Sequence, residues 1–260
     1  MKTSGNTILI TGGGSGIGRA LARRFHDRGD RVIVAGRRRE ALEETAAGRD
    51  GIAVMTLDVG QSGAVDRFAR ALLAEHPEVN VLINNAGIMP LEKVGSKRDL
   101  KDVERVVETN LLGPIRLIDA LVDHLAGRPD SAIVNVTSGL AYVPLIAAPT
   151  YSATKAAIHS YTVALRQALK ERVEVIELVP PGVQTGLTPG QEQRPGYMPL
   201  DEFADEVMSL FGRQPTPGEI LVERVKFQRD AEAEGRFDRT LIEMNQRAEA
   251  ARAAQPEPVG

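Results

Sequence analysis

Short apolar runs alternate with amphipathic segments along most of the chain. The runs lie at 7–10, 31–36, 52–59, 80–87, 132–137 and 173–179, with a shorter one at 218–224. Continuous apolar runs of this length are typical of parallel strands that are buried on both faces of a sheet. The segments between them have the apolar period of helices. The alternation predicts one doubly wound α/β domain, with helices on both faces of a parallel sheet.

The same pattern sets the expected limits of the domain. We expect a single domain over residues 1–250 and a tail that frays over 251–260, because no linker or internal repeat indicates a second domain. Residues 186–215 follow the sixth run, and the first part of this segment is rich in Pro, Gly and Gln. Such a segment past the end of a strand predicts a substrate loop or lid with few contacts of its own.

One long helical pattern, over residues 98–128, contains Pro114. Proline has no N–H to bind the carbonyl four residues earlier, which here belongs to Asn110. We therefore expect a kink that leaves the Asn110 backbone oxygen unpaired and presents its amide side chain. A kink that only lets the helix follow the core fits the pattern equally well.

A glycine-rich turn joins the first apolar run to the first helical segment. It reads TGGGSGIG from Thr11 to Gly18, a T-G-x-x-x-G-x-G pattern that differs from the commoner G-x-G-x-x-G. Glycines between a strand and a helix let the backbone approach a pyrophosphate, which then sits at the helix N-terminus. The turn predicts a Rossmann-type dinucleotide site, and a merely flexible turn is the alternative.

Tyr151 and Lys155 lie four residues apart, so they share one face of the helix predicted at 150–172. Ser138 directly follows the fifth apolar run and should lie at the end of that strand. A free tyrosine has a pKa of about 10, too high for efficient proton exchange near neutral pH. A neighbouring ammonium lowers that pKa because it favours the phenolate. The three residues predict a proton-transfer site, although a solvated lysine beside an interfacial tyrosine has the same spacing.

Composition limits the other classes of function. The 260 residues are 42% hydrophobic and 26% charged with a net charge of −3, which argues against a general nucleic-acid binder. The chain has no cysteine, and its four histidines lack ligand spacing, so we expect no metal site. No apolar run is long enough to cross a membrane, and the first residues lack a signal-peptide pattern. The cytoplasm is therefore the expected location.

Together the motifs resemble the short-chain dehydrogenase/reductase superfamily. The matching pieces follow the family's order over residues 7–186, and they are TGGGSGIG, Asp58-Val59, NNAG, Asn110, Ser138, Tyr151-x-x-x-Lys155 and PPGVQT. GLAYVPL and YSATKAAIHSYTVALR are similar to a bacterial branch labelled DltE-like. The resemblance implies an NAD(P)-dependent oxidoreductase (EC 1.1.1.-) that interconverts a small-molecule ketone or aldehyde with an alcohol by hydride transfer.

The resemblance also implies roles for individual residues. Tyr151 would be the acid/base, and Lys155 would lower its pKa and bind the nicotinamide ribose. Ser138 would hold the substrate oxygen, and Asn110 would anchor a water. The other implied cofactor contacts are Gly12, Ser15, Gly16, Ile17 and Gly18 at the pyrophosphate, Asp58 and Val59 at the adenine, Asn85, Ala86 and Gly87 at its ribose side, and Pro181, Gly182, Val183 and Thr185 at the carboxamide.

The end of the second strand distinguishes the two cofactors in such proteins. NAD-preferring relatives carry Asp or Glu there, bound to the ribose 2′-hydroxyl. This chain has Gly36, followed by Arg37, Arg38 and Arg39. A guanidinium binds a 2′-phosphate in a bidentate way, so we expect a preference for NADP(H), with Arg37 as the main contact and Arg38 assisting. Ser15 stands where many NADP-preferring relatives have a basic residue.

Two other functions fit parts of the pattern. A non-catalytic dinucleotide sensor would keep the glycine turn, but the intact set of Asn110, Ser138, Tyr151 and Lys155 argues against it. A sugar-nucleotide epimerase or dehydratase would have another glycine spacing and a longer C-terminal part. Met89, Tyr142, Leu187 and Tyr197 would either line a substrate pocket or serve packing. His159, one turn after Lys155, is more typical of an ordinary helix histidine than of a proton relay.

Small residues form a stripe along the helix that carries Tyr151. They are Ala153, Ala157, Ser160, Ala164 and Ala168. Such a stripe lets another helix approach closely, unless this face packs on the chain's own sheet. Similar proteins form dimers or tetramers through the helices that carry Asn110 and Tyr151, so a homodimer or homotetramer is expected.

Overall fold

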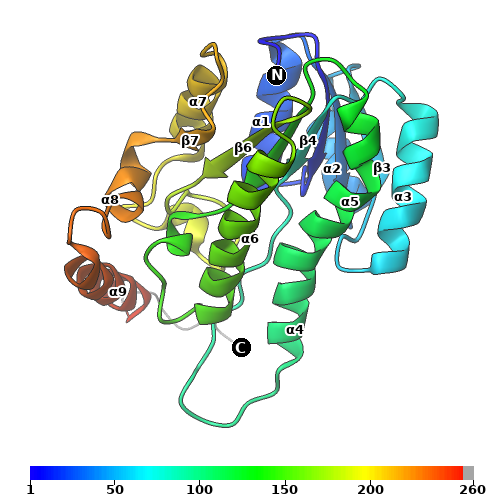
Figure 1. The fold of residues 1–260 in the computed structure, drawn as a ribbon. Helices are drawn as coiled ribbons and strands as arrows, with labels where there is room; N and C mark the ends of the chain where they lie inside the picture. The colour runs from blue at the N-terminus through cyan, green and yellow to red at the C-terminus, as the bar shows by residue number, and fades with distance from the viewer. Residues whose placement is uncertain (254–260) are drawn as a thin grey trace.

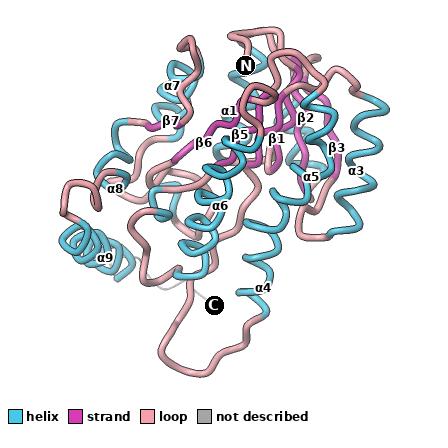
Figure 2. Tube along the Cα trace, viewed as in Figure 1, coloured by secondary structure: helices cyan, strands magenta, loops and turns pink. Residues whose placement is uncertain are grey.

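Seven parallel strands form one sheet in the order β3-β2-β1-β4-β5-β6-β7 (Figures 1 and 2). The strands are β1 Thr7–Thr11, β2 Arg31–Gly36, β3 Ile52–Thr56, β4 Val81–Asn84, β5 Ala132–Val136, β6 Glu174–Val179 and β7 Glu219–Leu221. The computed structural model describes residues 1–253. The predicted doubly wound parallel sheet is confirmed, with β3, β4 and β7 shorter than the apolar runs that predicted them.

Helices cover both faces of the sheet (Figure 1). One face carries α1 Gly16–Asp27, α2 Arg39–Ala46 and α7 Leu200–Phe211, and the other carries α3 Ser62–Glu75, α5 Gly113–Ala126 and α6 Pro149–Ala168. Successive residues of β1 point to opposite faces, so Ile8 and Ile10 belong to the first core and Leu9 to the second. The strands at the centre of the sheet are therefore mostly apolar, because both of their faces are buried.

The helical pattern over residues 98–128 is interrupted around Asn110, where the sequence predicted a kink. It consists of α4 Lys101–Val107, a π-helical turn Glu108–Leu112 and α5. Pro114 cannot donate to the Asn110 carbonyl, and the N–H of Gly113 instead binds the Glu108 carbonyl five residues earlier. The extra residue in this turn changes the direction of the side chains, and Asn110 is buried.

The chain after β6 is only partly irregular. It contains 3-10 turns at Gln191–Gln193 and Glu223–Val225 and ends with α8 Lys226–Arg229 and α9 Phe237–Ala253. The last helix includes the first three residues of the tail predicted to fray, and residues 254–260 lie outside the described part. None of the described helices is both long and apolar enough to span a membrane.

All seven strands end at the same edge of the sheet because they are parallel. Strand order reverses between β1 and β4, so the connections after these two strands lead to opposite faces. This divergence opens a crevice at the carboxyl ends of the strands, the usual ligand site of open α/β sheets.

Candidate active site

The turn after β1 lies against the end of β4. Gly12 has a φ of 67°, and a Cβ there would lie 2.9 Å from Ala86 Cα, so this position requires glycine. Asn85 Nδ2 donates to the Thr11 carbonyl at 2.9 Å. Thr11 Oγ1 accepts from the backbone N–H groups of Asn85 and Ala86, each at 3.0 Å. These bonds hold the start of α1 at the crevice.

A cleft of about 470 Å³ follows the crevice. It is lined by most of the residues predicted to bind cofactor or substrate, namely Gly12, Ser15, Gly16, Ile17, Arg37, Arg38, Asn85, Ala86, Gly87, Ser138, Tyr151, Lys155, Pro181, Val183 and Thr185. The glycine turn and the Tyr-Lys pair are far apart in sequence. The structure therefore brings the predicted cofactor residues and the predicted proton-transfer residues into one cleft.

Five predicted site residues do not line this cleft, and two of them belong to the region near β3. The Asp58 carboxylate accepts the Gly60 N–H at 3.0 Å, and Asp58 lines a separate groove of about 680 Å³ between β3 and α3. Val59 is buried, and a Cβ at Gly113 would lie 3.0 Å from it. Asp58 shapes the loop after β3, and Val59 packs that loop against α5.

The other three predicted residues lie outside the cleft and support the segments that line it. They are Gly18, Gly182 and Asn110. A Cβ at Gly18 would collide with the Gly12 carbonyl, and one at Gly182 would lie 3.1 Å from the Tyr197 ring. Asn110 Oδ1 accepts the Ile88 N–H, and its Nδ2 donates to the Ile88 carbonyl, both at 2.9 Å. The amide of Asn110 thus fixes the loop after β4, and its predicted role as a water anchor stays a prediction.

Tyr151 and Lys155 are both buried at the start of α6, with 7% and 4% of their surfaces exposed. Burial raises the pKa of Tyr151 to about 12, and a hydrogen bond with Ser138 opposes this shift. Burial lowers the pKa of Lys155 to about 8. Lys155 Nζ donates to the Val136 carbonyl at 2.7 Å and lies 5.6 Å from the centre of the Tyr151 ring. The pKa of Tyr151 is thus raised in this structure and not lowered as predicted from Lys155, because burial dominates.

Other residues complete the cleft. Met89 and Leu187 line it as considered from the sequence, whereas Tyr142 and Tyr197 do not. The lining residues for which the sequence analysis predicted no role are Ile88, Pro90, Arg105, Val136, Thr137, Pro180, Gly186, Pro189 and Gln191. Most of them are next to predicted site residues in the sequence, and this proximity could have identified them. Arg105 on α4, Pro189 and Gln191 had no such neighbour.

The segment after β6 is held in place more firmly than its composition suggests. Gln191 is 5% exposed, and its Nε2 donates to the Val183 carbonyl at 2.9 Å and to Thr185 Oγ1 at 3.1 Å. The N–H of buried Met198 donates to the Gly182 carbonyl at 2.8 Å. The expectation of few contacts is therefore wrong for this segment, because a buried glutamine and methionine anchor it. Its role as a lid stays a prediction.

The cleft has a strongly positive lining. Arg37, Arg38, Arg105 and Lys155 line it, and no aspartate or glutamate does so among the residues that the structure describes. Arg39, in contrast, begins α2 and binds Glu43 at the surface, with Nε 2.7 Å from Oε1. A cleft with cationic walls and a glycine turn suits a ligand that carries phosphate groups.

A model of the short chain dehydrogenase family matches residues 6–195. The chain belongs to this family. Uncharacterized oxidoreductase DltE of Bacillus subtilis (strain 168) is 38% identical over 250 residues, which are 94% of this chain and 98% of that protein. The predicted superfamily, its DltE-like branch and the NAD(P)-binding Rossmann fold of an oxidoreductase are thereby confirmed.

Two further family members are described with different cofactors. NADP-dependent 3-hydroxy acid dehydrogenase YdfG of Shigella flexneri is 30% identical over 180 residues, 69% of this chain and 73% of that protein. A 3-ketoacyl-(acyl-carrier-protein) reductase from Brucella melitensis, solved in complex with NADH, is 26% identical with a TM-score of 0.75. That match covers 84% of this chain and 96% of the reductase chain. The family thus leaves open which of the two cofactors this chain prefers.

The buried charge of Lys155 leads to a prediction about stability. Its pKa is about 8 in the folded protein against 10.5 for a free lysine, so the unfolded chain binds the proton more tightly. The resulting destabilisation is complete below pH 8 and disappears above pH 10.5. Lys155→Met should therefore raise the midpoint of thermal unfolding at pH 7, and raise it much less near pH 10.5.

Lys170, exposed just beyond the end of α6, provides the control. Lys170→Met should leave the midpoint nearly unchanged at both pH values, because an exposed charge costs little to keep. An equal midpoint for wild type and Lys155→Met at pH 7 would contradict the prediction.

Proposed function

We propose that the protein is an NADP(H)-dependent oxidoreductase that interconverts a ketone or aldehyde with the corresponding alcohol. The observation that carries the proposal is that Ser138, Tyr151 and Lys155 line the same cleft as the glycine turn of the dinucleotide site. The nicotinamide supplies or accepts the hydride when it is bound. The residues of the chain must then orient the two reactants and move one proton.

Tyr151 is the proposed proton donor during reduction. With a pKa of about 12 its phenol stays protonated at neutral pH, so a proton is available for a carbonyl oxygen. The Ser138 hydroxyl, which lines the cleft together with the phenol, would bind the same oxygen. The Lys155 cation would favour the phenolate that remains after transfer. In the oxidative direction the phenolate takes the proton back from the alcohol, a step that higher pH favours.

The cleft suits a dinucleotide with a 2′-phosphate. The backbone at Gly12 and Gly16 has positive φ values of 67° and 50°, which bring the turn and the start of α1 to the cleft without side chains. Gly36 ends β2 without a carboxylate, and Arg37 and Arg38 line the cleft next to it. Within the described residues neither guanidinium has an ion-pair partner. They are therefore the proposed ligands of the 2′-phosphate.

The central test is a panel of ketones, aldehydes, oxo acids and their alcohols, assayed with each cofactor. Oxo acids belong in it because the relative YdfG is a 3-hydroxy acid dehydrogenase and the cleft is cationic. Tyr151→Phe removes one hydroxyl and keeps the ring, so fold and NADPH affinity should persist. Turnover should fall by ~100-fold or more, the upper part of the general acid–base range. Wild-type turnover in this variant would refute the role of Tyr151.

Cofactor preference gives a second prediction. The ratio of kcat/KM for NADPH over NADH should exceed one, since each charged hydrogen bond contributes about 1.5–3 kcal/mol, or roughly 10- to 150-fold. The double variant Gly36→Asp/Arg37→Leu should invert or flatten this ratio, because it removes a cation and adds repulsion. Arg39→Leu is the matched control and should keep the ratio, as Arg39 binds Glu43 at the surface. A wild-type preference for NADH would contradict the assignment of NADP(H) but not the proposed reaction.

We further propose that the protein is a homodimer or homotetramer that uses α6. In support, the small-residue stripe does not pack on the chain's own sheet. Ala153, Ser160, Ala164 and Ala168 are exposed, and Ala157 is half-buried. Val163 beside them is 43% exposed. The face is thus free to receive a second helix.

Light scattering at micromolar concentration should give at least twice the chain mass of 28.0 kDa. Ala164→Arg places a long cation on the stripe and should lower that mass, whereas Lys170→Met just beyond the same helix should not. A wild-type mass of one chain would exclude the proposed oligomer.

A further inference from the structure

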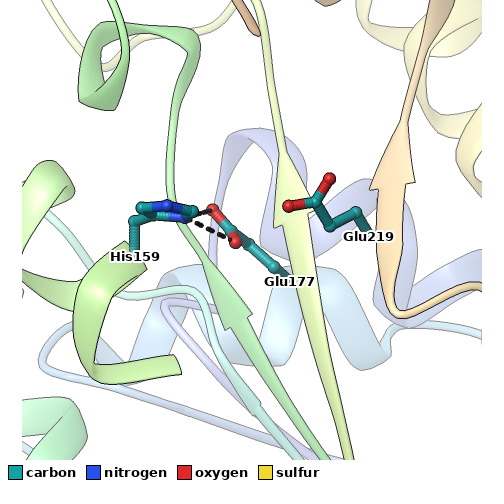
Figure 3. Close-up of side chains that lie close together, drawn as sticks. All are labelled: His159, Glu177 and Glu219. Atoms are coloured by element: carbon teal, nitrogen blue, oxygen red, sulfur yellow. Dashed lines mark hydrogen bonds and ion pairs between the residues drawn. The ribbon is translucent and has the colours of Figure 1, made fainter. Parts of the chain in front are cut away.

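A second polar cluster lies behind the catalytic residues, around β6 (Figure 3). Its centre is Glu177, which is fully buried. Glu177 Oε1 accepts hydrogen bonds from Thr137 Oγ1 at 2.7 Å and from Tyr142 Oη at 3.1 Å. His159 Nδ1 lies 2.8 Å from Glu177 Oε2. As Figure 3 shows, the imidazole and the Glu219 carboxylate approach Glu177 from two sides.

The cluster is a hydrogen-bonded network rather than a metal site. His159, Glu177 and Glu219 could each offer a ligand atom, all within 4.8 Å of one another. However, Arg229 already binds Glu219, with Nη2 3.1 Å from both carboxylate oxygens, and its guanidinium lies 4.8 Å from the centre of the Tyr142 ring. A metal ion would have to displace this cation and the donors on Glu177. The carboxylates are therefore satisfied within the protein.

The hydrogen bonds of Glu177 reach both sides of Ser138. Thr137 directly precedes Ser138, and Tyr142 directly follows the 3-10 turn Gly139–Ala141 that comes after it. One carboxylate oxygen thus binds both flanks of the turn that carries the Ser138 hydroxyl. Within the turn, Ser138 Oγ accepts the Leu140 N–H at 3.1 Å, which orients the hydroxyl.

The middle of this turn is also fixed. The Gly139 N–H donates to the Pro180 carbonyl at 2.9 Å, at the end of β6. On its other side lies Gln228 of α8, and a Cβ at Gly139 would collide with the Gln228 amide. The middle of the turn is thus held through its backbone and by Gln228, whereas its two ends are held by the Thr137 and Tyr142 hydroxyls on Glu177.

Glu177 is suited to this task because it stays ionised. Burial by itself would raise its pKa, but the hydrogen bonds from His159 and Thr137 lower it below its usual value. The bond to Glu177 in turn raises the pKa of His159. Glu219 and Arg229 are the other charged groups that face the pair. An ionised carboxylate accepts hydrogen bonds at both oxygens and so can bind all three donors at once.

We propose that Glu177 is a positioning residue that, through Thr137 and Tyr142, fixes the Ser138 hydroxyl against Tyr151. Its effect on turnover rests on the proposed function. Without these bonds, Glu177 would no longer hold the residues on either side of Ser138. The substrate oxygen would then be bound less well beside the phenol, while the distant glycine turn and the arginines at β2 would be unaffected.

Three variants test the proposal through turnover per NADPH-binding site. Thr137→Val removes the hydroxyl and should lower kcat by ~10-fold or more, the low end for a hydrogen bond to a charged group. Thr137→Ser keeps the hydroxyl and should stay near the wild-type kcat. Tyr142→Phe changes a residue outside the cleft, and this variant should also have a lower kcat than wild type. The Kd for NADPH should be unchanged in Tyr142→Phe, because Tyr142 lies outside the cleft.

Thr162→Val is the control for a merely structural loss. Thr162 is a buried threonine of α6 whose hydroxyl accepts from Asn135 Nδ2 at 2.9 Å and lies outside the cleft. This variant should lose stability and keep the wild-type kcat per site. Wild-type kcat in both Thr137→Val and Tyr142→Phe would overturn the proposal.

Amide hydrogen exchange provides a readout that needs no substrate. The Leu140 N–H is protected by Ser138 Oγ, so it should exchange faster in Thr137→Val and Tyr142→Phe and not in Thr162→Val. Unchanged exchange in the first two variants would overturn the positioning role. If wild type reduces no carbonyl of the panel while Leu140 exchange changes as expected, the proposed function fails and the positioning of Ser138 by Glu177 stands.

Discussion

Direct contact between the glycine turn and the end of β4 is the constraint on which the cleft depends. Gly12 and Gly18 have no side chains at the contact, and larger residues would collide with the backbone or with Asn85. Asn85 then fills the remaining space and binds the Thr11 carbonyl. Because β1 and β4 flank the point where strand order reverses, this contact sets where α1 begins relative to the strand ends.

Burial acts on the two central side chains of the cleft in opposite directions. It raises the pKa of Tyr151 to about 12 and lowers that of Lys155 to about 8, so both groups tend towards their neutral forms. Neither shift favours the stability of the ligand-free fold at neutral pH. Shifted pKa values in a cleft are typical of functional sites, where the surroundings are arranged for a reaction at the expense of stability.

The last part of the chain supports the loop that carries Ser138. From the sequence alone it could not be distinguished from a solvated charged helix. In the structure, Asn245 of α9 accepts the Ile146 N–H at 2.7 Å and donates to the Pro144 carbonyl at 3.1 Å. Gln228 of α8 packs against Gly139. The segment between Ser138 and Tyr151 is thus held from the C-terminal side as well as by Glu177.

By itself the sequence determined the strands, the glycine turn and the pairing of Tyr151 with Lys155. These features follow from local spacing, because apolar period and backbone hydrogen bonding act over a few residues. Only the tertiary structure decided that the helix around Asn110 contains a π-turn, that Gln191 is buried and that Glu177 binds both flanks of Ser138. Thr137 and Glu177 are forty residues apart and meet because β5 pairs with β6. Such contacts depend on how distant segments of the chain pack together, and a local sequence pattern does not predict that packing.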